Sequence, residues 1–414
     1  MSIKDYLVSE RIKCGAASTF SINAALAHSM ITTTCLGYLL HLGGLSSIDA
    51  TALQPFPLAL YAAKYWILHM RLGSGDEYPV WQLMIRLFAP EGNALENWVR
   101  LEDPEAVFPA DHRDETEPPP PIHPRMYYAA SFGLEELVTE LLKAGDDAQE
   151  RGGRCGTALG AASYHGHIKT VQILLDHGGG AEYASAMQAA CWCDHIAVVR
   201  LLLAHGADVN APGGFFGTAL QSAASSPGGE ALVRLLLDRG ADVNAPRGPY
   251  GTALQSAAFN GSEAVVRLLL GRGADVNARP GTFGTALQAA SLVGCAEVVR
   301  LLLDNGADIA SQGAEALRVA RAKGYDDIVQ MLLDRGVVED DNKEPDDREN
   351  VDAEEEAKHR SGPEYVEQNS ERGTKDDNAA ETGAGTLKGD EDDSHWYTAV
   401  ECQDGPGSPM TGTD

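Results

Sequence analysis

Apolar residues return at a step of about 33 positions through the second half of this chain. The block Gly-Thr-Ala-Leu begins at Gly156, Gly217, Gly251 and Gly284, and the last three of these lie 34 and 33 residues apart. Runs of three leucines keep the same step, at 201–203, 235–237, 268–270 and 301–303. Such a period is typical of stacked helix–turn–helix units, each of which buries its apolar face against its neighbours. The pattern therefore predicts an all-α solenoid that works by presenting a surface.

Each unit divides into two predicted helices. Thr-Ala-Leu opens a short first helix, whose small Ala-Ala pair permits close packing of the next unit. A glycine then turns the chain into a second helix rich in leucine, and a further glycine, such as Gly240 or Gly273, supplies the left-handed residue that ends it. Asp-Val-Asn-Ala and a Gly/Pro-rich stretch form the hairpin that follows. We count seven units, which begin near Tyr127, Gly156, Ala184, Gly217, Gly251, Gly284 and Gly313.

The first 110 residues lack this period, and their apolar spacing predicts a small bundle of five helices. The predicted ranges are Ile3–Ile12, Asn23–Leu42, Pro57–Arg71, Val80–Phe88 and Ala94–Leu101. We expect Ser21 to be the N-cap of the second helix and Pro57 to lie in the first turn of the third. One face of that third helix is expected to pack against neighbouring helices, and it carries Leu58, Tyr61, Ala62, Tyr65 and Leu68.

Changes in composition divide the chain into four parts. Residues 1–110 are the predicted helical domain, 111–124 a Pro-rich linker, 125–338 the repeats and 339–414 a tail. The tail holds 24 acidic and 7 basic residues with few aliphatic ones, which predicts an acidic, disordered segment. Its apolar island at 395–400 is either a short docking motif or an incidental cluster.

Charge and cysteine usage narrow the class of protein. The formal net charge is −28, and a strongly negative protein is repelled by phosphate backbones and anionic membranes. We therefore expect no nucleic acid and no membrane as partner. No uninterrupted apolar run reaches the roughly 18 residues of a membrane span, and the N-terminus lacks a signal-peptide core. Seven dispersed cysteines without C-x-x-C spacing indicate reduced thiols, which predicts a soluble intracellular protein, and we expect it in the cytoplasm.

Sequence motifs for chemistry are missing. No G-x-x-x-x-G-K-[ST], G-x-S-x-G or H-E-x-x-H sequence occurs, and Cys191 and Cys193 have no second Cys/His pair at zinc-finger spacing. Arginines recur once per unit, but Glu230 and Glu263 stand four residues before two of them and neutralise the stripe. We predict no catalytic residue, no cofactor, no metal and no small-molecule substrate, so the chain is not expected to be an enzyme.

Three features of the units carry a family resemblance. They are Gly-Thr-Ala-Leu-Gln, the Val-Val-Arg-Leu-Leu-Leu helix, and Gly-Ala-Asp-Val-Asn at 206–210, 240–244 and 273–277. With these features, the chain resembles the ankyrin repeat family over about half its length. Gly-Thr-Ala-Leu-Gln stands where that family has Thr-Pro-Leu-His. The resemblance implies a protein-binding solenoid. It also implies that the glutamine at the histidine position links neighbouring turns by hydrogen bonds, at Gln188, Gln221, Gln255 and Gln288.

Departures from the family pattern predict local differences. The third unit begins 28 residues after the second, so the hairpin near residues 178–183 should be shortened. The first unit has Tyr127-Tyr128 where Ala-Leu is expected, which suggests packing against the N-terminal helices. The last unit carries polar residues such as Glu315 and Arg318, as a closing unit of a solenoid requires.

Positions that vary between units are the candidate binding residues. Two residues follow each Ala-Ala pair, near the end of the first helix and, on the ankyrin pattern, near the concave groove. The hairpin tips vary as well. Large side chains there are plausible anchors for a protein partner. An aromatic residue also recurs just before each first helix, at Phe216, Tyr250 and Phe283, where it is expected to buttress the next unit. The candidate protein-binding residues are Tyr164, Trp192, Phe215, Arg247, Phe259 and Leu292.

Residues 1–105 resemble a segment of large fungal NACHT–ankyrin proteins, which are similar to NOD-like receptors. The resemblance rests on residues 56–69 and, in the same order as in that family, on residues 2–10, 34–39 and 98–104. No Walker motif is present, so the ATPase activity of that family does not carry over. The chain is then either a naturally short relative or a truncated gene model. Two functions stay open: binding of a partner in the ankyrin groove, or an adaptor whose acidic tail makes the main contact.

Overall fold

The computed structural model describes residues 23–45, 48, 50–73, 77–102, 122–178, 183–213, 217–246, 251–278, 281 and 283–337. Within these ranges the regular structure is helical, with isolated bridges only between Gly213 and Gly217 and between Gly281 and Gly284. The all-α fold expected from the sequence is confirmed. The predicted helix Ile3–Ile12, most of the linker, the shortened hairpin at 179–182 and the acidic tail lie outside the described residues, so the four domain boundaries stay predictions.

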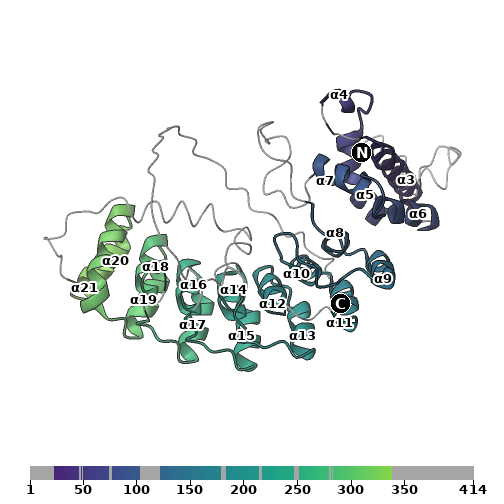
Figure 1. The fold of residues 1–414 in the computed structure, drawn as a ribbon. Helices are drawn as coiled ribbons and strands as arrows, with labels where there is room; N and C mark the ends of the chain where they lie inside the picture. The colour runs from purple at the N-terminus through teal and green to yellow at the C-terminus, as the bar shows by residue number, and fades with distance from the viewer. Residues whose placement is uncertain are drawn as a thin grey trace, which may run out of the picture. The chain divides into compact units, whose positions relative to one another are not determined.

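In the N-terminal part, the described residues form five helices (Figure 1). They are α3 (Ala24–Leu42), α4 (Ala50–Leu53), α5 (Ala59–Leu72), α6 (Glu77–Leu87) and α7 (Ala94–Leu101). The expected N-cap of α3 is wrong, because the Asn23 side chain accepts the Leu26 N–H at 3.2 Å. Pro57 lies before α5 and not in its first turn, since Leu58 is the N-cap.

Trp98 of α7 lies at the centre of this helical part. Its ring is 1% exposed, and it packs edge-on against Trp66 with ring centroids 5.6 Å apart. Phe88 packs on Trp98 at 6.0 Å, and the indole N–H donates to the Ala63 carbonyl at 3.0 Å. Neighbouring Asn97, also buried, donates to the Leu42 carbonyl at 2.9 Å. Helices far apart in sequence are therefore joined by one aromatic cluster, in which the Trp98 indole N–H is hydrogen-bonded and the buried Trp66 indole N–H has no partner among the described residues.

Helix α5 buries a different face from the one expected. Its small residues pack inward with Trp66 and Ile67, whereas Leu58, Tyr61 and Leu68 are 56%, 43% and 49% exposed. Of the five residues that were expected to pack inward, only Ala62 is buried, and Tyr65 is half-buried. Small side chains let α3 and α5 approach closely, and this explains why the alanine face is turned to the core.

The first repeat packs on the helical part, as the tyrosine pair at 127–128 suggested. The rings of Tyr128 and Phe132 lie 6.2 Å and 5.6 Å from Trp98. Arg125 donates to the Phe88 carbonyl at 3.0 Å and pairs with Asp146 at 2.5 Å. The hydrogen bond to Asp146 raises the pKa of the Arg125 guanidinium. The open end of the solenoid is thus covered by aromatic and charged contacts.

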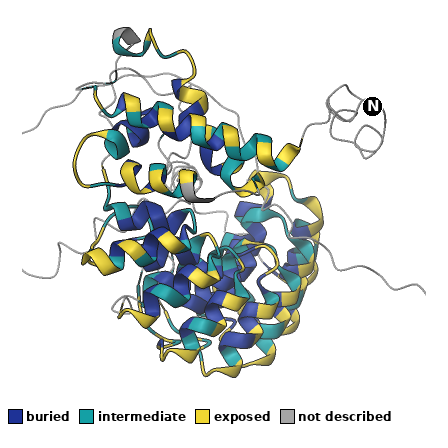
Figure 2. Ribbon diagram, turned by 90° about the vertical axis from the view of Figure 1, so that its right-hand side faces the viewer, coloured by how far each residue is buried: buried dark blue, intermediate teal, exposed yellow. Residues whose placement is uncertain are grey.

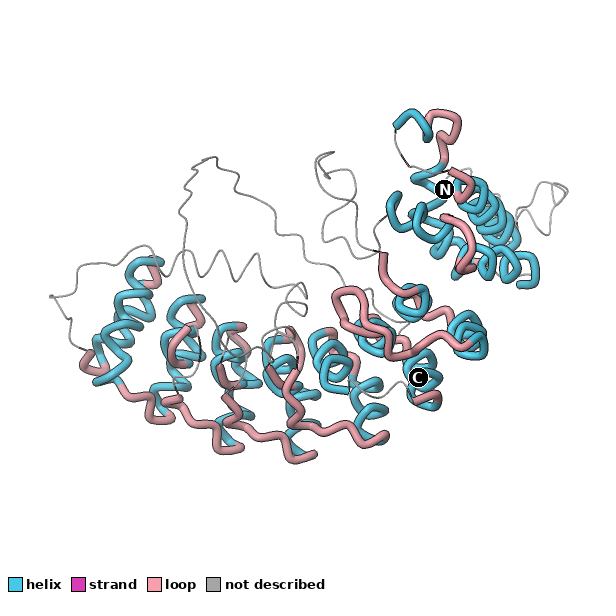
Figure 3. The backbone as a smooth tube through the Cα atoms, viewed as in Figure 1, coloured by secondary structure: helices cyan, strands magenta, loops and turns pink. Residues whose placement is uncertain are grey.

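Seven helix pairs follow, which agrees with the seven units counted in the sequence (Figures 1 and 3). First helices pack against the first helices of neighbouring pairs, and the buried residues lie on their inner sides (Figure 2). The pairs are α8 (Arg125–Ser131) and α9 (Glu135–Ala144), α10 (Ala158–Tyr164) and α11 (Ile168–Asp176), α12 (Tyr183–Trp192) and α13 (Ile196–Ala204), α14 (Ala219–Ser225) and α15 (Glu230–Asp238), α16 (Ala253–Phe259) and α17 (Glu263–Gly271), α18 (Ala286–Val293) and α19 (Ala296–Asp304), and α20 (Ile309–Lys323) and α21 (Asp326–Asp334).

Threonine starts four of the first helices. The side chain of Thr157 accepts the Gly160 N–H at 3.2 Å, and Thr218, Thr252 and Thr285 cap α14, α16 and α18 in the same way. The second helices end before a glycine with positive φ, for example Gly240 at 85° and Gly273 at 88°, as expected from the sequence. Local capping chemistry therefore repeats together with the leucine pattern.

The last repeat begins earlier than expected. The seventh unit was predicted to begin near Gly313, but its first helix α20 already begins at Ile309 and has 15 residues. The Asp308 side chain caps this helix by accepting the Ala310 N–H at 3.1 Å. No Gly/Pro-rich stretch separates Asp308 from Gly313, so the helix continues directly from the preceding turn and no hairpin forms. The outer end of the solenoid is thereby closed by one long helix.

Candidate protein-binding surface

Buried glutamines join neighbouring repeats, as the resemblance implied. The Gln221 amide nitrogen donates to the Ala245 carbonyl at 3.0 Å and to the Gly251 carbonyl of the next hairpin. Gln255 makes the equivalent bonds to Ala278 and Gly284. Its side-chain oxygen accepts the Thr252 N–H at 2.8 Å. Gln221 and Gln255 therefore tie the start of their own helix to the hairpin that follows, and Gln188 donates to the Gly213 carbonyl of its hairpin. The expected link is not found for Gln288, whose oxygen accepts the Thr285 N–H of its own helix start but which forms no bond to the next repeat among the described residues.

Asparagines form a second, parallel set of links at the base of the hairpins. Asn244 donates to the Gly273 carbonyl at 3.2 Å and accepts the Asp275 N–H at 2.8 Å. Asn210 and Asn277 repeat this pair of bonds with the repeats that follow them. These asparagines are exposed, but their side chains bond to the next repeat. We therefore assign them a structural role and do not count them as candidate binding residues.

Ion pairs neutralise most of the arginine stripe on the second helices. Arg234 pairs with Glu230 at 2.8 Å, Arg267 with Glu263 at 2.6 Å, and Arg300 pairs with the glutamate three residues before it. The pairs predicted from the spacing are thus confirmed. All are exposed pairs, which contribute only a few tenths of a kcal/mol each.

Four of the six candidate residues lie at equivalent places in the repeats. Tyr164, Trp192 and Phe259 are the last residues of α10, α12 and α16, and Leu292 lies one residue before the end of α18. All four are half-buried, so each offers part of its side chain to solvent. Phe259 also stacks on Phe283 with ring centroids 4.5 Å apart. This contact joins Phe283 to the repeat before it, so the expectation that Phe283 buttresses the next repeat stays a prediction.

The other two candidates, Phe215 and Arg247, lie outside the described residues, as do Phe216 and Tyr250.

Histidines link the candidate positions of successive repeats, a feature that the sequence analysis missed. His195 shares a 3.0 Å hydrogen bond with the Tyr164 carbonyl, and His167 makes the same bond to the Ser131 carbonyl. Burial lowers the pKa of the His167 imidazole. Each histidine packs on a turn glycine of the previous repeat, since a Cβ on Gly133 or Gly166 would lie 2.7 Å from its ring. The Gly-His dipeptide before α11 was the available signal.

One turn next to Trp192 departs from the others. Asp194 has φ of 57° and is the one non-glycine residue with positive φ in the described ranges. Equivalent turn positions elsewhere are glycines, such as Gly261 and Gly294. The residue of the following repeat that would cover this turn is Gly229, where other repeats have His195 or Tyr325. Absence of a covering side chain leaves space for the Asp194 side chain, which gives the surface around Trp192 a local charge.

Comparison with known proteins decides the family. Residues 126–213, 214–280 and 279–343 match the model described as ankyrin repeats (3 copies), and together they span more than half of the chain. The chain belongs to the ankyrin repeat family. It is 36% identical over 188 residues to the azaphilone pigments biosynthesis cluster protein L of Monascus ruber. That match covers 43% of this chain and 39% of the relative, so the chain spans about two fifths of the relative's length.

A solved structure, the human ASB11 ankyrin repeat domain, is also similar. It is 25% identical, has a TM-score of 0.44, and the match covers 51% of this chain and 96% of that chain.

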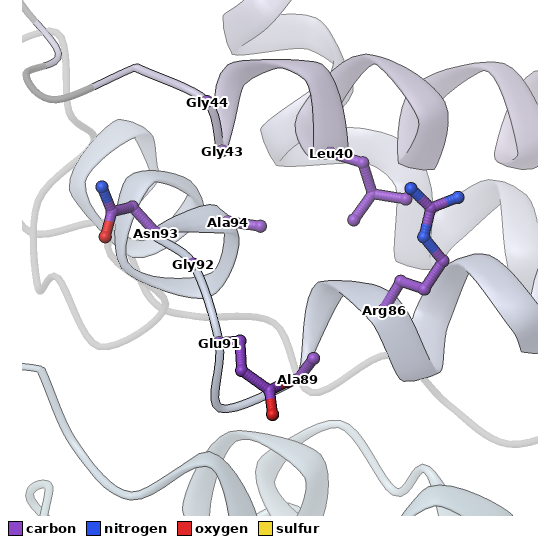
Figure 4. A pocket seen from close by; sticks show the side chains of 9 residues that line it. All are labelled: Leu40, Gly43, Gly44, Arg86, Ala89, Glu91, Gly92, Asn93 and Ala94. Atoms are coloured by element: carbon purple, nitrogen blue, oxygen red, sulfur yellow. The ribbon is translucent and has the colours of Figure 1, made fainter.

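Outside the ankyrin repeats, a cavity of about 340 Å³ lies between the ends of α3, α6 and α7 (Figure 4). Its polar lining side chains are Arg86, Glu91 and Asn93. Figure 4 shows Arg86 next to Leu40, whereas Glu91 extends away from both. This set contains no nucleophile next to a base, the arrangement that covalent catalysis requires.

The described residues contain neither a metal-binding cluster nor a helix that could span a membrane. Across the described ranges, no three His, Cys, Asp or Glu side chains are grouped so as to hold a metal ion. The described helices also include none with the length and apolar character needed to cross a bilayer. Cys191 is fully buried, and this burial raises the pKa of its thiol far above the usual range, so its thiol is not poised as a nucleophile.

Proposed function

We propose that this ankyrin repeat protein is a non-enzymatic interaction module that binds a protein partner along the ends of its first helices and its hairpin tips. One observation carries the proposal. Framework side chains such as the capping threonines and the linking glutamines recur in several repeats, whereas the half-buried residue near the end of the first helix changes from Tyr164 to Trp192, Ser225, Phe259 and Leu292. A surface that varies on a constant framework is what recognition of one particular partner requires.

The chemistry of these positions supports apolar anchoring. Adjacent first helices pack at about 8–10 Å, so Trp192 and its neighbours in sequence order form a row along the solenoid. Large aromatic side chains in such a row are the residue types that contribute most to protein–protein affinity. Phe215 and Arg247 of the hairpins are included in the proposed surface because they lie in the variable tips.

The test compares variants in the full chain. Trp192→Ala and Leu292→Ala should each reduce capture of the partner, identified by proximity labelling in the source cells, by at least tenfold. Ile168→Ala is the matched control, because Ile168 is 43% exposed but lies on a second helix. Circular dichroism must show that all three variants keep the helical signal. If both groove variants retain every partner of the wild type, the proposed surface is wrong.

A deletion separates this proposal from the alternative in which the acidic tail makes the main contact. Removal of residues 339–414 takes away 24 acidic side chains and leaves the repeats intact in sequence. Groove binding should survive the deletion, whereas tail binding should be lost. The same deletion also tests whether the island at 395–400 is a docking motif.

The non-enzymatic role rests on the fold and on the residues found. Ankyrin repeats are binding scaffolds, and the described cavity lacks a catalytic pair. The relative from Monascus ruber is named for a biosynthesis cluster, but its name states no reaction. We therefore propose that this chain acts as a scaffold or a sensor. We propose the same role if the chain belongs to a biosynthesis cluster. Turnover of a metabolite by the purified chain would contradict it.

We further propose that the chain is related to NACHT-type receptors, in which it would form the sensor arm. The support is the order of the segments 2–10, 34–39, 56–69 and 98–104 in the sequence. Sequencing of the transcript upstream of Met1 tests the relation. An in-frame G-x-x-x-x-G-K-[ST] motif followed by these segments is expected, and an upstream stop codon directly before Met1 would favour a free-standing protein.

A further inference from the structure

Exposed apolar side chains gather on the helical part and not on the ankyrin repeats. Among the described residues, ten large hydrophobic side chains are exposed, and eight of these lie between Leu26 and Ile85. Only Ile122 and Ile168 lie elsewhere. Contiguous exposed apolar surface marks an interaction site more often than scattered single residues do. The helical part therefore needs an explanation of its own, separate from the groove.

Helix α5 and its N-cap residue carry four of these positions in one stripe, together with the half-buried Tyr65. Leu58, Tyr61, Tyr65, Leu68 and Leu72, named here the α5 stripe, are spaced by 3, 4, 3 and 4 residues. That spacing is the a/d pattern by which a helix packs along a second helix. Leu58, Leu68 and Leu72 are 56%, 49% and 50% exposed, although the opposite face of α5 is buried in the core.

The aromatic members of the stripe are held in place. The rings of Tyr61 and Tyr65 lie 5.0 Å apart. The Tyr61 hydroxyl is hydrogen-bonded to His69 at 2.7 Å, and His69 in turn contacts His28 of α3 at 2.7 Å. A surface whose side chains are already ordered loses less conformational entropy when a partner binds.

The charge beside the stripe has one sign. Helices α3 and α5 contain no Asp or Glu, whereas Lys64 and Arg71 lie on the exposed side of α5. Neither forms an ion pair with another described residue, and the hydrogen bond found for Arg71 goes to the Phe132 carbonyl at 3.0 Å. The stripe is thus an apolar seam bordered by cations.

We propose that the α5 stripe binds an amphipathic helix of a partner protein, with leucine-type residues at a and d and acidic residues beside them. The apolar side chains of the α5 stripe match the leucine-type residues of such a helix, and the cations beside the stripe match its acidic residues. A second copy of this chain fits poorly, because it would place Lys64 and Arg71 against a face without carboxylates. Residues 1–22 fit poorly as well, since they hold three basic and two acidic side chains.

Two designed peptides test the proposal with the full chain. Each has 21 residues in three heptads with Leu at a and d, and the two differ only in having Glu or Lys at e and g. Fluorescence anisotropy should show at least tenfold tighter binding of the Glu peptide. Leu68→Gln and Lys64→Glu should each weaken its binding at least tenfold. The matched control Ile168→Gln, at an isolated exposed isoleucine, should leave binding unchanged, and so should Trp192→Ala of the groove.

Four outcomes would overturn the proposal. Equal binding of the two peptides, or an equal loss in Ile168→Gln, would show nonspecific adhesion. A tenfold gain on deletion of residues 2–22 would show that this segment covers the stripe. A wild-type dimer in sedimentation that Leu68→Gln dissolves would show that a second copy covers it. None of these results depends on the groove, so the two proposals fail or survive separately.

Discussion

The helical part and the ankyrin repeats are both all-α, but they are held together in different ways. In the repeats, each contact recurs: Gln221 and Gln255 make the same bonds one repeat apart, as do Asn210 and Asn244. In the helical part, a single residue, Trp98, joins helices α5, α6 and α7 and also the first repeat. Stability is therefore distributed in one region and concentrated in the other.

This difference is also seen at the surface. A repeat buries its apolar residues against its neighbours, so the array exposes few large hydrophobic side chains. Among the described residues, the helical part packs against the first repeat at one side, and helix α5 remains apolar on its outer side. The stacking of the repeats thus leaves little exposed apolar surface for other partners, whereas the helical part retains such a surface.

Substitution of Trp98 is expected to have the largest effect. Trp98→Ala removes a 1% exposed ring and the indole hydrogen bond to Ala63, which should lower the free energy of unfolding by about 3–5 kcal/mol. Urea denaturation measures the loss, and hydrogen exchange should locate it in α5–α8. The matched control is Trp192→Ala, whose ring is half-buried in a single repeat. Similar losses in both variants would contradict concentration of stability at Trp98.

Loss of one glutamine link is expected to cost less. Gln221 is 1% exposed, and Gln221→Ala leaves the Ala245 and Gly251 carbonyls without their donor. We expect a loss of about 1–3 kcal/mol, measured by urea denaturation. Gln288→Ala is the control within the same ladder. The Gln288 oxygen accepts the Thr285 N–H, but no hairpin follows its repeat because α20 begins at Ile309.

The Gln288→Ala control separates the contribution of the bonds between repeats from that of the bond at the helix start. If Gln288→Ala destabilises the chain as much as Gln221→Ala, the cross-repeat bonds contribute little, and the cost comes from the helix start alone.

The sequence predicted those features that repeat, and it failed where a choice depends on a neighbour. Turn glycines, threonine caps and the glutamine links follow from residue types within one unit, so their recurrence in several units reinforces the inference. The face of α5 could not be chosen in this way. Both faces are apolar, and the outcome depends on how closely Ala59 and Ala63 allow α3 to approach.

Four of the six candidate residues lie near the ends of first helices, as the repeat pattern predicted, but their surroundings were not foreseen. The stacking of Phe259 on Phe283 joins side chains 24 positions apart, and the bond from His195 to the Tyr164 carbonyl joins two repeats. Spacing in one unit carries no information on such contacts between units. The start of α20 was missed for a related reason, since only the absence of a hairpin segment marks it.

A dependence of stability on pH should appear in both regions. Burial lowers the pKa values of His69 in the helical part and His167 in the repeats. Below about pH 6.5 the unfolded chain binds protons that the folded chain does not, so stability must fall as the pH decreases from 6.5 through the folded pKa values. Urea midpoints at pH 7.5 and 5.5 measure the slope. His167→Gln should reduce it, and an unchanged slope would contradict the role of burial at His167.

The smallest expected effect concerns the turn beside Trp192. Asp194 occupies the left-handed region at φ 57°, and burial raises the pKa of its carboxyl, so both the backbone and the charge disfavour the aspartate there. Asp194 also stands two residues before α13, where a negative charge is favourable. These effects partly cancel, and Asp194→Gly should stabilise the chain by only about 0.5 kcal/mol. The reverse change in the preceding repeat, Gly166→Asp, should be clearly destabilising, because a Cβ there would lie 2.7 Å from the His195 ring. If urea denaturation finds Gly166→Asp neutral, the turns are not set by the covering side chain of the next repeat, and the repeats are less tightly coupled than their hydrogen bonds indicate.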